Sequence, residues 1–147
     1  MVHVMAPKPA ERRLPLFFNV DTSVGTGGQN TSMDDILLVQ YFLSLIGKHS
    51  PDRAKFFPLT QIPVTGKLNQ ETSAGIMFLQ QDAGASPDGR VSVARGYRYG
   101  GVAFTIVQLN FKVKGLFPQK WPNIEEMPEC PKFLDLACRR ALVGDVS

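Results

Sequence analysis

The sequence has little cysteine and little histidine. Of its 147 residues only Cys130 and Cys138 are cysteine, and only His3 and His49 are histidine. If both cysteines lie on one helix, their separation in sequence places them about 12 Å apart, and a disulfide requires roughly 4.4–6.8 Å between Cα atoms. We therefore expect two free, largely buried thiols. The histidines stand at no ligand-like spacing, so the sequence predicts no metal site and no cofactor.

Long hydrophobic runs and a dominant charge are also missing. The longest apolar segments, 36–46 and 102–111, are short, whereas a transmembrane helix needs about 20 residues. The 16 basic and 13 acidic residues give a net charge of +3, and they form no dense Lys/Arg stripe of the kind that binds phosphates. The sequence therefore predicts neither a membrane span nor nucleic-acid binding.

The N-terminal segment does not have the order of a secretory signal. Its basic residues follow proline instead of preceding an apolar core. We expect the protein to be cytoplasmic when synthesised, so that delivery to the periplasm or cell wall would need a signal-independent route.

The remaining composition is that of an ordinary globular chain. Hydrophobic residues make up 44% and charged residues 20%, enough apolar side chain for one core. The Pro-rich, charged segment 1–13 is expected to be a flexible tail, and 14–147 a single domain. Within it, 14–20 is either a short strand or an apolar strap over the core. The Gly-rich segment 21–32 fits no phosphate-binding motif and indicates a flexible turn.

Helical patterns dominate the rest of the chain, so we expect a mainly α fold. A helix should begin near Ser32, with acidic residues in its first turn as in a capping box, and end at Gly47. A second should begin at Asn69 or Leu68 and end by Gly84. A third is expected over about 102–115, with a strand as the alternative for 102–109 because of its β-branched residues.

The final helix should follow Pro131. Long connections are expected before the second helix (48–66) and before this one (117–131), because both are rich in proline. The side chains expected to face the core from the final helix are Phe133, Leu134, Ala137, Ala141 and Leu142.

Two helices and two turns carry an ordered signature. The first helix reads DDILLVQYFLSLIG from Asp34, the second VTGKLNQETSAGIMFLQQ from Val64, and a turn reads DGRVS from Asp88. This order resembles the peptidoglycan-binding-domain-like family, a small three-helix module attached to many bacterial cell-wall hydrolases. The matching positions are Asp35, Val39, Gln40, Leu43, Gly47, Thr65, Gly66, Leu68, Thr72, Ile76, Leu79, Gln80, Asp88, Gly89 and Val91.

The resemblance covers about 23–96 and extends plausibly to 116. It implies a compact three-helix peptidoglycan-binding-like bundle with long loops, with a core module over about 23–116 and a C-terminal extension, 117–147, that adds a helix. Three features depart from the family pattern. The connection 49–64 is longer than usual, Ser92 stands where Gly is common, and the Thr expected to start the next helix soon afterwards is absent.

The candidate ligand-binding residues each have a structural alternative. Gln40 and Gln80 either bind a ligand in an interhelical groove or hydrogen-bond loop backbone, and we favour the second. Asp88 either contacts a muropeptide amine or bonds its own turn. Aromatic and basic side chains near this turn suit sugars and carboxylates, although a plain solvated loop is the alternative: Arg90, Arg95, Tyr97, Arg98 and Tyr99. Trp121 is either a binding platform or a plug that anchors the Pro-rich loop.

The resemblance implies a noncatalytic module that binds or targets the bacterial cell wall, with a peptidoglycan glycan strand or stem peptide as partner. The alternative is a protein-interaction scaffold that kept the fold without the ligand, in a phage or secretion apparatus, with a partner docked on the C-terminal extension. A wall-cutting enzyme is not expected, because no pair of carboxylates at the fixed separation of a glycosidase can be identified among Glu71, Asp82, Asp88, Glu125, Glu126 and Glu129.

Overall fold

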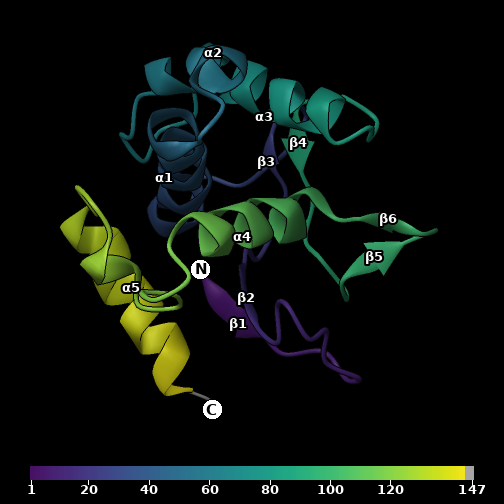
Figure 1. Ribbon diagram of the computed structural model, residues 1–147, viewed down its shortest axis with the longest axis vertical. Coiled ribbons are helices and arrows are strands. Elements are labelled where there is room, and N and C mark those ends of the chain that lie inside the picture. Colours follow the sequence, from purple (N-terminus) through teal and green to yellow (C-terminus); the bar gives the residue numbers. More distant parts are fainter. Residues whose placement is uncertain (145–147) are drawn as a thin grey trace.

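The computed structural model describes residues 1–144, which form five α-helices and three two-stranded ladders (Figure 1). Helix accounts for 46% of the chain and strand for 11%, so the mainly α prediction is confirmed. The last three residues of the extension predicted over 117–147 lie outside the described residues. Buried apolar side chains form one continuous cluster that runs from Val2 to Cys138.

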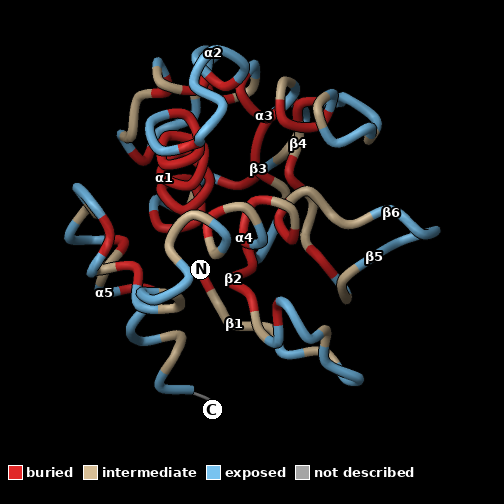
Figure 2. The backbone as a smooth tube through the Cα atoms, viewed as in Figure 1, coloured by how far each residue is buried: buried red, intermediate tan, exposed pale blue. Residues whose placement is uncertain are grey.

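Helix α1 (Met33–His49) is the centre of the structure. Its residues from Asp34 to Gly47 are all buried (Figure 2), because a helix that is apolar on every side is stable only when other elements surround it. The predicted start at Ser32 is confirmed. Its hydroxyl, however, donates to Asp34 Oδ1 at 2.5 Å and makes no cap hydrogen bond to the helix backbone, so the capping box is wrong.

The predicted helix end at Gly47 is also wrong, since α1 continues to His49. Gly47 allows a close approach between α1 and the 3-10 helix η1 (Phe57–Gln61). A Cβ atom at this position would lie 2.5 Å from the carbonyl carbon of Leu59 and 2.6 Å from the amide nitrogen of Thr60. The glycine is therefore needed for packing and not for ending the helix.

The variant Gly47→Ala is expected to lower the free energy of unfolding by about 1–3 kcal/mol, because overpacking against backbone outweighs the better helix propensity of Ala. Urea denaturation followed by circular dichroism measures the change. The control is Gly115→Ala in α4 (Thr105–Leu116), where a Cβ would meet nothing within 4 Å and stability should be unchanged or higher by up to about 1 kcal/mol. Equal stabilisation by both variants would contradict the close approach.

The connection expected over 48–66 contains regular structure. It holds α2 (Arg53–Phe56) and η1, and it leads to α3 (Gln70–Asp82). The predicted start of this helix is confirmed, because the Asn69 side chain caps it by accepting the Thr72 amide at 2.8 Å.

The segment 102–115, for which a helix and a strand were considered, contains both: a strand at 102–103 and a helix from Thr105. Strand β4 (Arg90–Val91) pairs with β3 (Val24–Gly25) from the Gly-rich segment. Strands β5 (Arg98–Tyr99) and β6 (Val102–Ala103) form a hairpin that projects from the molecule (Figure 1). Helix α4 (Thr105–Leu116) then crosses α1.

The N-terminal residues do not form the tail expected over 1–13. Strand β1 (His3–Met5) pairs antiparallel with β2 (Phe17–Asn19), with Val4 opposite Phe18. Val2 is buried, and its amide donates to Asp34 Oδ2 at 2.8 Å. The charged, Pro-rich composition of 1–13 predicted a tail, although the short apolar stretch at 2–5 is able to pair with β2. Of the two alternatives for 14–20, the strand is confirmed, because residues 17–19 form β2.

Helix α5 (Lys132–Val143) packs on the core through Leu134, Ala137 and Cys138, and a short 3-10 helix, η2 (Ile124–Glu126), precedes it. The prediction for Phe133 is wrong: it is exposed, because adjacent residues of a helix point about 100° apart.

Both cysteines are free, as predicted, with Cys138 buried and Cys130 partly so. No helix within 1–144 has both the length and the hydrophobicity needed to cross a bilayer.

Candidate functional site

Gln40 on α1 holds the turn that precedes α3. Its Nε2 donates to the carbonyl of Lys67 at 2.8 Å and to the hydroxyl of Thr72 at 3.0 Å. Its Oε1 accepts the backbone amides of Thr65 at 2.9 Å and Gly66 at 2.8 Å. The side chain is fully buried, and both ends of its amide group are hydrogen-bonded within the protein.

Gln80 on α3 holds the next turn in the same way. Its Nε2 donates to the carbonyl of Arg90 at 2.9 Å, to Asp88 Oδ1 at 3.0 Å and to the hydroxyl of Thr105 at 3.1 Å. Its Oε1 accepts the Gly89 amide at 2.9 Å. The side chain is buried, so for both glutamines the hydrogen bonds match the structural alternative.

The two networks form an internal repeat. In each, one glutamine accepts the amide of a turn glycine, donates to the carbonyl of the next residue, and donates to a threonine near the start of the following helix. In the second network the threonine is Thr105, the first residue of α4. The β5–β6 hairpin separates it from the turn in sequence, which is why spacing alone missed it.

Asp88 also acts within its turn. Its Oδ1 accepts the Arg90 amide at 2.9 Å as well as the Gln80 side chain, as is usual for an Asp in an Asp-Gly turn. The guanidinium of Arg90 lies 3.7 Å from Asp88 Oδ2 and is partly exposed. Both side chains are therefore partly open to solvent, with Arg90 39% and Asp88 45% exposed.

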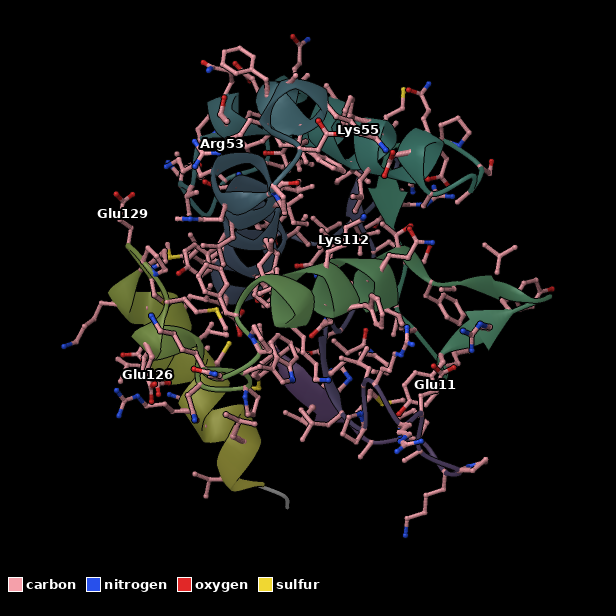
Figure 3. The ribbon with its side chains drawn as sticks, viewed as in Figure 1. Glu11, Arg53, Lys55, Lys112, Glu126 and Glu129 are labelled. Carbon is pink, nitrogen blue, oxygen red and sulfur yellow. The ribbon has the colours of Figure 1, made fainter. Side chains whose placement is uncertain are left out.

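The structure gives different roles to Tyr97, Arg98 and Tyr99. The Tyr97 hydroxyl donates to the Leu14 carbonyl at 2.7 Å and accepts the Glu11 amide at 3.2 Å, so it anchors the N-terminal segment. Arg98 forms an ion pair with Glu11, which lies beside the hairpin (Figure 3). Tyr99 is 80% exposed on the hairpin and is free to contact a ligand.

A hollow of about 230 Å³, which we name the hairpin cleft, lies between the hairpin, α4 and the N-terminal segment. It combines aromatic rings with charges of both signs. The side chains that give it this character are Glu11, Tyr97, Arg98, Phe111 and Lys112. Tyr97 and Arg98 of the predicted set therefore meet here, whereas Gln40, Gln80 and Trp121 do not.

Trp121 acts as a plug. Its ring packs edge-on against Phe18, with centroids 5.6 Å apart, and against Phe42 at 6.2 Å. Among the described residues its buried Nε1 has no hydrogen-bond partner. The ring is partly buried against the core, and this environment matches an anchor for the Pro-rich loop.

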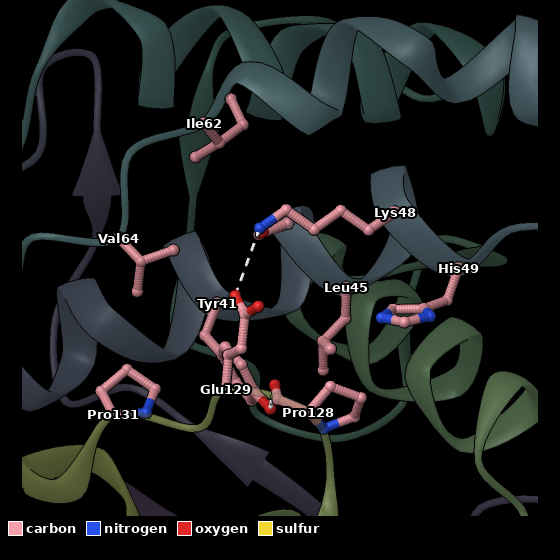
Figure 4. Close-up of a pocket in the computed structure, with 10 residues that line it drawn as sticks. Tyr41, Leu45, Lys48, His49, Ile62, Val64, Pro128, Glu129 and Pro131 are labelled. Carbon is pink, nitrogen blue, oxygen red and sulfur yellow. Dashed lines mark hydrogen bonds and ion pairs between the residues drawn. The ribbon is translucent and has the colours of Figure 1, made fainter.

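A larger hollow, about 420 Å³, lies beside α1 and is named the α1 pocket (Figure 4). One wall is α1, another is the segment after η1, and the third is the loop 128–131 of the C-terminal extension. Its lining residues are Tyr41, Ser44, Leu45, Lys48, His49, Ile62, Val64, Pro128, Glu129 and Pro131. The sequence gives no sign of this site, because its walls are far apart in the chain.

The phenol of Tyr41 and the thiols of Cys130 and Cys138 keep their protons at neutral pH. Burial, with smaller contributions from Cys130 and Glu129, raises the pKa of Tyr41, so its hydroxyl keeps the proton that it donates to the Pro128 carbonyl at 2.6 Å. Burial, reinforced by Asp135 and Glu125, raises the pKa of Cys130 to about 12. Burial likewise raises the pKa of Cys138. Both thiols are therefore protonated at neutral pH and are poor nucleophiles.

In the part of the chain that the structure describes, no three His, Cys, Asp or Glu side chains are grouped so that they could hold a metal ion. Comparisons with protein-family models, curated proteins and solved structures found no match to this chain.

Proposed function

We propose that this chain is a noncatalytic module that binds or targets bacterial peptidoglycan. The observation that carries the proposal is the repeated glutamine network. It joins α1 to α3 and α3 to α4 through the two turns whose order resembles the peptidoglycan-binding-domain-like family. In this proposal the three helices are the family's bundle, and residues from 117 onward are an addition to it.

The hairpin cleft supplies groups suited to a cell-wall polymer. Phe111 within the cleft and Tyr99 on the adjoining hairpin expose aromatic surface on which the apolar face of a sugar can stack. Arg98 and Lys112 place cations beside it, and Arg is suited to bidentate binding of carboxylates. Affinity should be modest, because a few stacking and polar contacts must offset the ordering of a flexible ligand.

Cosedimentation of the purified protein with isolated peptidoglycan sacculi tests the proposal. We expect saturable binding that soluble muropeptides compete away, without release of soluble wall fragments. Release of fragments by the purified protein would contradict the noncatalytic part. Absence of binding at tens of micromolar protein would contradict the binding itself.

The variant Tyr99→Ala is expected to weaken sacculus binding by about 2- to 10-fold, because an aromatic contact contributes roughly 0.5–1.5 kcal/mol. Its stability should stay within about 0.5 kcal/mol of the parent, since the side chain is exposed. The matched control is Phe57→Ala, an exposed aromatic on η1, which should bind as the parent does. Equal weakening in both variants would point to nonspecific adhesion.

A second candidate function is a protein-interaction adaptor that uses α5. Phe133, Leu136 and Val143 are 53%, 50% and 84% exposed, and their spacing places them on one side of the helix. Exposed apolar stripes of this kind mark interaction surfaces. The cosedimentation experiment separates the two candidates, because the adaptor has no reason to bind sacculi.

A further inference from the structure

The α1 pocket has the size and lining of a small-ligand site. Its volume of about 420 Å³ lies within the roughly 300–1,000 Å³ that is usual for such sites. Leu45, Ile62 and Val64 provide apolar surface, and polar groups enter from α1 and from the loop 128–131 (Figure 4). Polar groups placed beside an apolar surface can orient one ligand.

One ion pair spans the pocket. Lys48 Nζ lies 3.6 Å from Glu129 Oε1, and the two side chains are 48% and 82% exposed. A pair this long and this exposed contributes little to folding, so a ligand can separate it at small cost. A ligand that carries both charges would replace each partner, with its carboxylate on Lys48 and its ammonium on Glu129.

The loop that carries Glu129 is held in position. Glu129 has φ of 56°, which a non-glycine residue keeps only when its surroundings enforce it. The Tyr41 hydroxyl holds the preceding carbonyl, that of Pro128, at 2.6 Å. Proline restricts the loop further at 128 and 131. A loop backbone that is fixed in advance lowers the entropy lost when a ligand binds to it.

We infer that the α1 pocket binds a stem-peptide residue that carries an ammonium and a carboxylate on one carbon. This inference rests on the proposed function for its choice of ligand. The sugars of the glycan have no ammonium group to pair with Glu129, which lines this pocket. The charged pair is therefore better suited to the peptide part of the polymer than to its sugars. In this inference the glycan binds at the hairpin cleft.

Titration calorimetry with the free tripeptide L-Ala–D-Glu–diaminopimelate tests the inference, because the side chain of diaminopimelate ends in such a zwitterionic carbon. The same tripeptide with L-Lys at its third position keeps the amine but lacks that carboxylate. We expect the Lys form to bind at least about tenfold more weakly, as for the loss of a charge-assisted hydrogen bond.

The variants Lys48→Gln and Glu129→Gln should each weaken binding of the diaminopimelate tripeptide by about tenfold or more. Lys8→Gln and Glu126→Gln remove matched exposed charges that do not line the pocket, and they should bind as the parent does. Circular dichroism confirms that each variant is folded.

The outcomes distinguish this inference from the proposed function. Sacculus binding by the parent, together with tripeptide binding that Lys48→Gln and Glu129→Gln leave unchanged, overturns the pocket assignment alone. No detectable tripeptide binding at millimolar concentration also overturns it. Absence of sacculus binding overturns the proposed function, whereas tripeptide binding that depends on Lys48 and Glu129 would still support the pocket.

Discussion

Replacing Gln80 by alanine is expected to lower the free energy of unfolding by about 3–4 kcal/mol. The variant Gln80→Ala removes hydrogen bonds to Asp88, Arg90 and Thr105 and to the Gly89 amide. Each buried partner left unsatisfied costs about 1–3 kcal/mol, and the cavity adds to this loss. Urea denaturation followed by circular dichroism gives the value.

The control for this variant is Gln81→Ala, the adjacent exposed glutamine on the same helix, which should change stability by no more than about 0.5 kcal/mol. Gln40→Ala should resemble Gln80→Ala, because Gln40 makes the corresponding hydrogen bonds in the first network. A stable Gln80→Ala protein with reduced wall binding would show instead that this glutamine contacts the ligand.

The variant Trp121→Ala is expected to cost about 3 kcal/mol, the lower end of the range for removing a large aromatic side chain from a core. Its ring fills the space beside Phe18 and Phe42 and thereby joins the Pro-rich loop to β2 and α1. Because Trp121 is the single tryptophan of the chain, unfolding has to be followed by circular dichroism and not by tryptophan fluorescence.

Trp121→Phe is the informative companion of this variant. It keeps an aromatic ring and removes an indole N–H that is buried without a partner among residues 1–144, so its loss of stability should be well below that of Trp121→Ala. Full stability of Trp121→Ala, with loss of sacculus binding, would return Trp121 to the role of a binding platform.

These two predictions change how a mutational search for the ligand should be designed. Gln40, Gln80, Asp88, Tyr97 and Trp121 are taken up by contacts within the protein. Substituting them would lower binding through unfolding and would not identify a contact. The residues that can report on binding without this complication are those with exposed functional groups: Arg90, Arg98, Tyr99, Lys48 and Glu129.

Local chemistry was sufficient to predict much of the helical framework. The apolar pattern of 36–46 predicted a helix, and α1 includes that segment. Asn69 predicted a helix start because its side chain can cap the backbone, which it does. The Asp-Gly pair at 88–89 predicted a tight turn, and Gly89 has a φ of 72°. Each of these features depends on residues only a few positions apart.

Contacts between distant segments settled the features that were predicted wrongly or missed. Gly47 is in the interior of α1 because Leu59 approaches it, and 1–5 are ordered because β2 and Asp34 provide partners for them. Thr105 joins the Gln80 network across an intervening hairpin. The α1 pocket exists because the loop carrying Glu129 returns to Lys48. The local sequence pattern indicates which segments can bury an apolar surface. Which surface each segment packs against depends on how distant parts of the chain come together. Local periodicity carries no information about those distant contacts.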